Sequence, residues 1–159
     1  MTVADALARI QVIQIHPGAA SVVIVAAERM AAASGADIVR TSIDVEVRTA
    51  GVFQISFPER NGVAGSTPAL FLRLSEDGAG FLTATSSSLL YGGVVNLLKR
   101  LGDEAVKKYR DGRRMDVAFD WQRSLFDFVL TQEGRIHHGR DPAAYVEQLA
   151  ARGFTHVEV

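Results

Sequence analysis

The chain has 159 residues, of which 48% are hydrophobic and 22% are charged, so a disordered chain is excluded. Its formal net charge of −1 argues against a nucleic-acid partner, because proteins that follow a phosphate backbone carry a basic excess. The absence of cysteine excludes a disulfide framework, a thiol nucleophile and a cysteine-ligated metal.

The N-terminus has neither the basic region nor the long apolar core of a secretion signal. No apolar run approaches the roughly 18 residues that a membrane-spanning helix needs. We therefore expect a cytoplasmic protein without a membrane partner.

The first 35 residues predict a strand followed by a helix. Residues 10–15 (IQVIQI) are apolar and rich in β-branched side chains, and they stop at the turn around Pro17. The alanine-rich run 21–34 follows, and Gly35 suits its left-handed end. One face of this helix is expected to be buried through Val23, Ala26, Ala27, Met30 and Ala33.

The next segments predict antiparallel strands. Residues 42–48 alternate strictly between apolar and polar, and 52–57 resumes the alternation after the turn signal at Ala50 and Gly51. We interpret these two runs as a β-hairpin with one solvent-exposed face. Residues 69–74 and 80–85 predict two further strands across a tight turn, the first of them central in the sheet.

A second helix is predicted after these strands. Its apolar side chains recur at helical spacing, and two glycines inside it call for a close approach to a neighbouring element. Residues 103–116 are rich in charge, and we interpret them as a solvated linker. The apolar stripe of the helix is Leu90, Val94, Leu97, Leu98 and Leu101.

The end of the chain has the composition of a βαβ unit. A strand at 124–131 is followed by a polar loop, a helix at 141–152 that begins with Asp-Pro, and an apolar strand at 155–159. The fold class is therefore α+β: a mostly antiparallel sheet with two helices on one face, followed by a short βαβ-like segment. We expect one domain over 1–115 and the start of a second, truncated α/β domain over 116–159.

The segment 78–101 (GAGFLTATSSSLLYGGVVNLLKRL) carries a family resemblance. Its GFLTAT strand and the helix that opens LLYGG resemble the N-terminal accessory domain of β-N-acetylhexosaminidases (glycoside hydrolase family 20) and α-glucuronidases (family 67). The similarity covers about residues 10–101, and the tail resembles the first strand, helix and second strand of the (β/α)₈ barrel that follows in those enzymes.

This resemblance implies a non-catalytic domain that supports a glycosidase barrel. The acidic catalytic pair of family 20 lies on a later barrel strand, so we assign no catalytic residue and expect the chain to be inactive by itself. The implied partner is the catalytic barrel of the same parent protein, and neither a metal nor another cofactor is expected. Carbohydrate is a further candidate ligand of this chain.

Three residues of the tail are candidates for substrate binding. The resemblance matches Arg123 to an arginine that grips the hydroxyls of the terminal sugar, with Asp127 nearby. His137 lies in the loop after the first barrel strand, on the catalytic side of such a barrel. An alternative for Arg123 and Asp127 is a structural role at a strand end, and the adjacent pair His137 and His138 lacks a metal-ligand spacing.

Other functions stay open from the sequence. The aromatics of the predicted strands fit a core better than a sugar platform. The chain could also be a free-standing interaction or carbohydrate-binding module that forms a homodimer through an exposed sheet edge. An autonomous enzyme is disfavoured, because the spacing assembles no nucleophile, base and orienting group.

Overall fold

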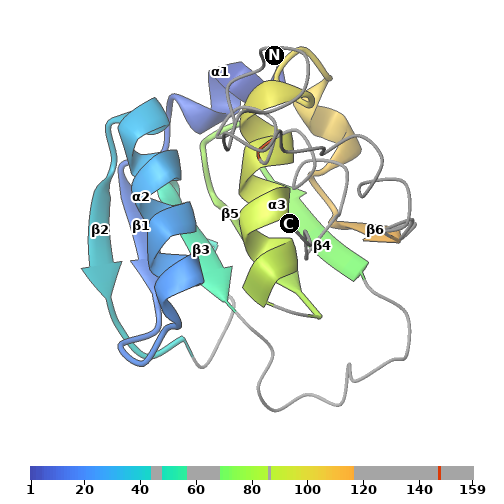
Figure 1. Cartoon of the computed structure of the whole chain (residues 1–159). Helices are drawn as coiled ribbons and strands as arrows, with labels where there is room; N and C mark the ends of the chain where they lie inside the picture. The colour runs from blue at the N-terminus through green and yellow to red at the C-terminus, as the bar shows by residue number, and fades with distance from the viewer. Residues whose placement is uncertain (44–47, 57–68, 86, 117–146, 148–159) are drawn as a thin grey trace, which may run out of the picture.

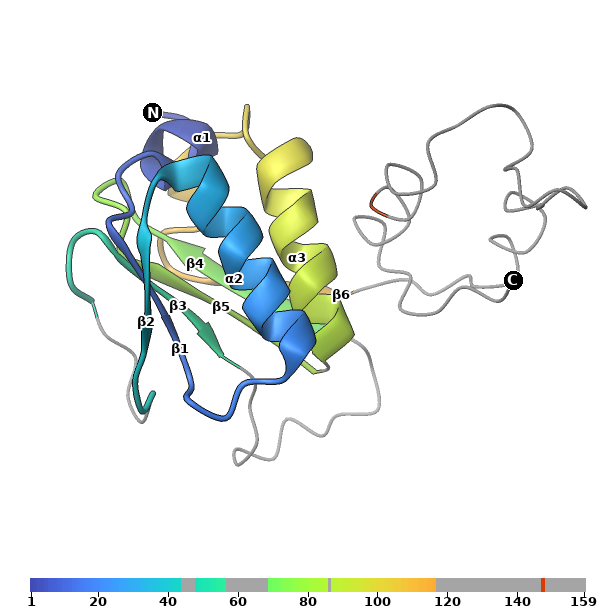
Figure 2. The ribbon, with the colours of Figure 1, turned by 60° about the vertical axis from the view of Figure 1, so that its left-hand side comes forward.

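A computed structural model describes residues 1–43, 48–56, 69–85, 87–116 and 147. Within these ranges six strands form one sheet, and the helices α2 and α3 lie side by side on one of its faces (Figures 1 and 2). In chain order the elements are α1 (Val3–Leu7), β1 (Val12–Ile15), α2 (Ser21–Ser34), β2 (Asp37–Arg40), β3 (Val52–Ser56), β4 (Ala69–Leu74), β5 (Gly80–Ala84), α3 (Ser87–Lys99), the 3₁₀ helix η1 (Val106–Lys108) and β6 (Arg113–Asp116).

The sheet is mixed, which corrects the prediction of a mostly antiparallel sheet. Its strand order is β2-β1-β3-β5-β4-β6. The pairs β2–β1, β1–β3 and β3–β5 are parallel, and only β5–β4 and β4–β6 are antiparallel. The parallel half arises because α2 carries the chain over the sheet from β1 to β2, as a crossover between parallel strands requires.

The predicted hairpin of 42–48 with 52–57 is also wrong. Strand β3 is present, but β1 and β5 occupy its two edges, so no edge is free for a hairpin partner. Residues 44–47 lie outside the described residues. The turn at Gly51 is confirmed by its φ of 73°, a left-handed conformation that glycine adopts without strain.

Two of the three predicted helices are confirmed, and the third, at 141–152, lies outside the described residues apart from Glu147. Helix α2 ends at Gly35 with φ 76°, and it buries four of the five predicted residues, whereas Ala33 is exposed. Leu90, Val94 and Leu97 of α3 are fully buried against the sheet. The core between the sheet and the two helices also contains Ile13, Ile15, Phe53, Ile55, Leu72, Leu74 and Leu82.

The charge-rich segment 103–116 is part of the fold, not a linker. The first amides of α1 donate to this region: Val3 N–H to the Glu104 carbonyl at 2.8 Å, and Ala4 N–H to the Gly102 carbonyl at 3.0 Å. Thr2 also forms a β-bridge with Ala105. The unsatisfied donors of a helix start thus hold residues 102–105 in place, and β6 then closes the sheet beside β4.

The described sheet ends at Asp116, next to the predicted domain boundary. The strand at 124–131, the strand at 155–159 and the second domain as a whole lie outside the described residues, apart from Glu147. The boundary and the βαβ-like tail therefore stay predictions.

Candidate functional site: a carboxylate between two helices

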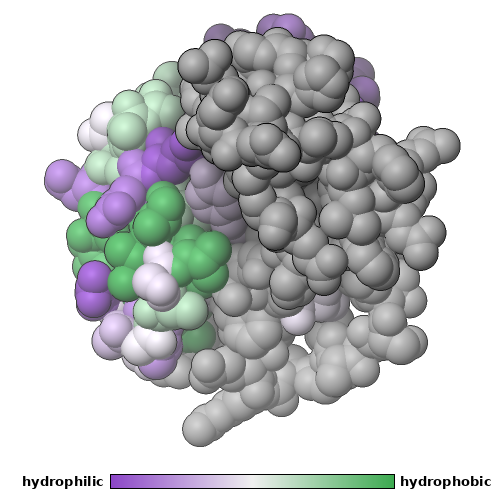
Figure 3. All heavy atoms as spheres, in the orientation of Figure 1, coloured by the Kyte–Doolittle hydropathy of each residue, from purple (hydrophilic) through white to green (hydrophobic). Residues whose placement is uncertain are grey.

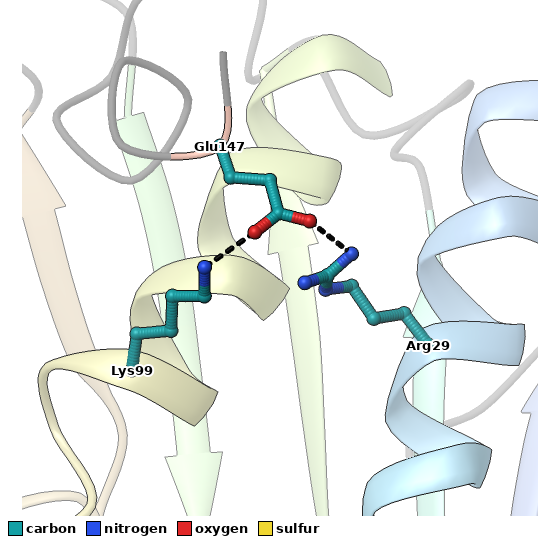
Figure 4. Close-up of polar contacts among 3 residues, drawn as sticks. All are labelled: Arg29, Lys99 and Glu147. Atoms are coloured by element: carbon teal, nitrogen blue, oxygen red, sulfur yellow. Dashed lines mark hydrogen bonds and ion pairs between the residues drawn. The ribbon is translucent and has the colours of Figure 1, made fainter. Parts of the chain in front are cut away.

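An ion-pair cluster joins α2, α3 and the C-terminal part of the chain. Arg29 of α2 contacts one carboxylate oxygen of Glu147 through Nη1, and Lys99 of α3 donates from Nζ to the other (Figure 4). The two cations come from neighbouring helices, and the single acid bridges them. We refer to Arg29, Glu147 and Lys99 as the Glu147 bridge.

The positions of the two cations follow from the helical period. In α2 the residues Ala26, Ala27 and Met30 are fully buried, and Arg29 lies off this stripe with 35% of its side chain exposed. Lys99 is the last residue of α3, where a cation also interacts favourably with the helix dipole. Both cations therefore lie partly exposed, and both reach the carboxylate of Glu147.

The electrostatics favour an ionised carboxylate at Glu147. Its side chain is only 16% exposed, which by itself disfavours the charge. The hydrogen bond from Lys99 and the positive charge of Arg29 outweigh this cost and lower the pKa of the Glu147 carboxyl below its usual value. The bridge is thus an ion pair at neutral pH, and its chemistry is that of a contact between parts of the chain.

A second polar group lies on the sheet face opposite the helices. Gln54 Nε2 donates to Gln14 Oε1 at 3.0 Å, and the guanidinium of Arg73 lies 5.3 Å from the ring centroid of Phe81. Phe81 also stacks on Phe71, with ring centroids 5.3 Å apart. Gln54 and Arg73 are 2% and 5% exposed, whereas Gln14, Phe71 and Phe81 are half-buried, so the group lies between interior and surface.

The third polar group anchors η1. Tyr109 is 1% exposed, and its hydroxyl donates to Glu104 Oε2 at 2.8 Å, which Lys108 Nζ approaches at 3.2 Å. The basic residues expected in a linker are exposed, as predicted, but they belong to η1, the following turn and β6. They are Lys107, Lys108, Arg110, Arg113 and Arg114.

The sequence-predicted site residues are not brought together by the described structure. Arg123, Asp127 and His137 all lie outside the described residues, so their roles stay predictions. Within the described ranges no group of three or more His, Asp or Glu side chains could hold a metal ion. Sequence reasoning missed the Glu147 bridge, because its members are far apart in the chain and each resembles an ordinary surface charge.

Three comparisons with known proteins found no match to this chain among family models, curated proteins or solved structures. Among the described helices, none combines the length and apolar character required to cross a membrane.

Proposed function

We propose that residues 1–115 form a non-catalytic N-terminal accessory domain of a glycoside hydrolase of the β-N-acetylhexosaminidase or α-glucuronidase type, and that the catalytic barrel begins at about residue 116. The position of the segment 78–101, which carries the family resemblance, supports this proposal. It folds as β5 followed by α3, and its Leu82, Leu90 and Leu97 are at most 1% exposed. Residues buried in this way pack the fold and do not contact a substrate, which fits a domain that supports the catalytic barrel.

The glycines of the motif fit the same role. A Cβ placed on Gly93 would lie 2.9 Å from Leu70 Cδ2 and 3.2 Å from Leu82 Cδ2, so α3 rests closely on β4 and β5. This contact accounts for a residue that costs a helix about 1 kcal/mol relative to alanine. The motif thus specifies how a helix packs on a sheet, and in this proposal the packed unit supports the barrel.

The coding sequence that follows codon 159 tests this proposal. We expect it to encode further barrel strands, and we expect the longer protein to hydrolyse aryl glycosides that the 159-residue chain leaves intact. In the longer protein, Arg123→Ala should raise KM, as a contact to the terminal sugar predicts. A stop codon directly after codon 159, with no barrel encoded downstream, would refute the proposal, as would glycoside turnover by the short chain.

A homodimeric interaction module is the second candidate, and strand β2 favours it. β2 is an edge strand of the described sheet, and Val39 is 42% exposed. Antiparallel pairing of two β2 copies around the centre of the strand would set Asp37 opposite Arg40 twice and Ile38 opposite Val39. Such an edge is self-complementary in charge, as an isologous contact requires.

The mass in solution distinguishes the two candidates. A dimer that Val39→Pro converts to a monomer, with unchanged circular dichroism, would favour the interaction module. A monomer at all concentrations up to about 100 µM, well above the Kd range of stable interfaces, would favour the accessory domain.

A further inference from the structure

The outer side of the helix pair has a repeated arrangement that the proposed function does not use. On α2, Val25 lies one turn before Arg29, and on α3, Val95 lies one turn before Lys99. Residues four apart share a helix face, so each helix presents a valine followed by a cation. We call these four residues the clamp face. Figure 3 shows hydrophobic surface over α2 in the same region.

Val95 is buried on a side of α3 that the sheet does not reach. Gly93 contacts Leu70 and Leu82 of the sheet, and Val95 follows it by two residues, which is about 200° around the helix. Val95 therefore points away from β4 and β5, yet it is 0% exposed. Its cover is therefore the neighbouring helix α2, which packs along α3, or the C-terminal part of the chain. In contrast, Val25 on α2 is 49% exposed.

The charges of the clamp face indicate what covers it. Arg29 and Lys99 are like charges on two packed helices, and they converge on one point above the pair (Figure 4). An acidic group at that point removes their mutual repulsion and satisfies both donors. The carboxylate of Glu147 occupies this point, and each of its oxygens meets one cation.

We propose that the clamp face is the docking surface for this chain's own C-terminal part, which Glu147 locks in place by bridging Arg29 and Lys99. Val95, which is buried, supplies the apolar contact, whereas Val25 stays half-exposed. The two cations select the acidic residue. If the proposed function is correct, this surface is the joint between accessory domain and barrel. The docking itself rests only on the contacts of the 159-residue chain.

Zero-length cross-linking of the purified 159-residue chain with a carbodiimide tests the contact. The reagent joins an amine to a carboxylate only where the two already touch, and the chain has just three lysines, Lys99, Lys107 and Lys108. We expect a Lys99–Glu147 cross-link in the peptide map of the monomer. The neighbouring pair Lys108–Glu104, with 3.2 Å between Nζ and Oε2, provides a positive control in the same digest.

Charge variants test whether two cations are needed. Arg29→Gln should lower the Lys99–Glu147 yield about two- to fivefold, the range expected for losing one partly exposed ion pair. Arg100→Gln removes an exposed cation next to Lys99 and should leave the yield unchanged. Reversing all three charges, with Arg29→Glu, Lys99→Glu and Glu147→Lys, should restore a cross-link of opposite polarity between the same positions.

The outcomes separate this inference from the proposed function. A digest that contains the Lys108–Glu104 cross-link but not Lys99–Glu147 overturns the docking. So does a Lys99–Glu147 cross-link that Arg29→Gln and Arg100→Gln reduce equally. Neither result depends on glycosidase activity, and the absence of a downstream barrel would leave the cross-link unaffected. The Lys108–Glu104 yield also reports on folding of each variant, because this pair lies outside the clamp face.

Discussion

At the scale of single residues, the contact between Tyr109 and Glu104 should make stability depend on alkaline pH. Burial, followed by the hydrogen bond to Glu104, raises the pKa of the Tyr109 hydroxyl to about 12 from the ordinary 10.0. The neutral form is favoured in the folded state, so this contribution is complete below pH 10 and is lost as the pH rises toward 12. Tyr109→Phe should lower the free energy of unfolding by about 1–2 kcal/mol at pH 8. Urea titrations of this variant should also show a smaller loss of unfolding free energy between pH 10 and about 12.

The matched control is Tyr91→Phe, because Tyr91 lies partly buried on α3. It should change stability at pH 8 by less than about 0.5 kcal/mol and keep the alkaline loss. Glu104 gives the opposite dependence of stability on pH. The hydrogen bonds from Tyr109 and Lys108 lower the pKa of the Glu104 carboxyl, so its contribution is present above the usual glutamate pKa and is lost as the pH falls. An equal alkaline loss in Tyr109→Phe and wild type would contradict this assignment.

Gly35 and Gly112 both have positive φ, but only Gly112 has a neighbour where a Cβ would lie. Alanine variants of the two glycines therefore separate the cost of the backbone conformation from the cost of a steric clash. Gly35 has φ 76° and open space where a Cβ would lie, whereas Gly112 has φ 88° and the Phe71 ring only 2.4 Å from that point. Gly35→Ala should cost about 1 kcal/mol for the left-handed backbone alone. Gly112→Ala should cost about 2–4 kcal/mol, because the ring also has to move. Urea unfolding measures both, and equal costs would show that the contact with Phe71 is unimportant.

At the scale of elements, the packing of α3 on the sheet can be tested at Gly93. Alanine gains about 1 kcal/mol in helix propensity, but its Cβ meets the Leu70 and Leu82 methyl groups at 2.9 and 3.2 Å. The two effects oppose, so Gly93→Ala should stay within about 1 kcal/mol of wild type. Gly93→Leu should cost about 3 kcal/mol or more, since no rotamer fits between helix and sheet. A stable Gly93→Leu variant in thermal melts would mean that α3 lies further from the sheet.

The sequence predicts an element well when the residues of that element alone determine its conformation. Helix α2 has its apolar period and Gly35, and the β4–β5 pair has its short turn, so their own residues specify them. Strand β2 was missed, because its four residues are mostly exposed and β1 alone holds them in the sheet. The alternation in 42–48 is stronger than any pattern in β2, and it led to a hairpin that the pairing of β3 excludes.

At the scale of the whole molecule, neither the strand order nor the Glu147 bridge could be predicted from the sequence, and the reason is the same for both. Both depend on contacts between residues that are distant in the chain, and no local pattern records such partners. Glu147 lies on a predicted helix, where a lone acidic residue reads as solvent-exposed. The buried Arg73 was hidden similarly, since its strand is otherwise apolar and its aromatic neighbour Phe81 lies on another strand.

The domain should fold without the residues after Asp116. The core between sheet and helices is built before Asp116, and the N-terminus is tied to residues 102–105. A chain that ends at Asp116 should therefore unfold cooperatively in urea, as a domain with its own core does. It should nevertheless lose stability, because Arg29 and Lys99 lose their shared acid, Glu147.

Val95→Ser tests whether the same residues also cover Val95. If the cover of Val95 comes from residues 117–159, the substitution should cost about 1.5–3 kcal/mol in the full chain and less than about 0.5 kcal/mol in the shorter one. Val25→Ser, on the half-exposed counterpart of α2, is the matched control and should cost little in either chain. Equal costs of Val95→Ser in both chains would place its cover within the first 116 residues and leave the docking to the two cations and Glu147 alone.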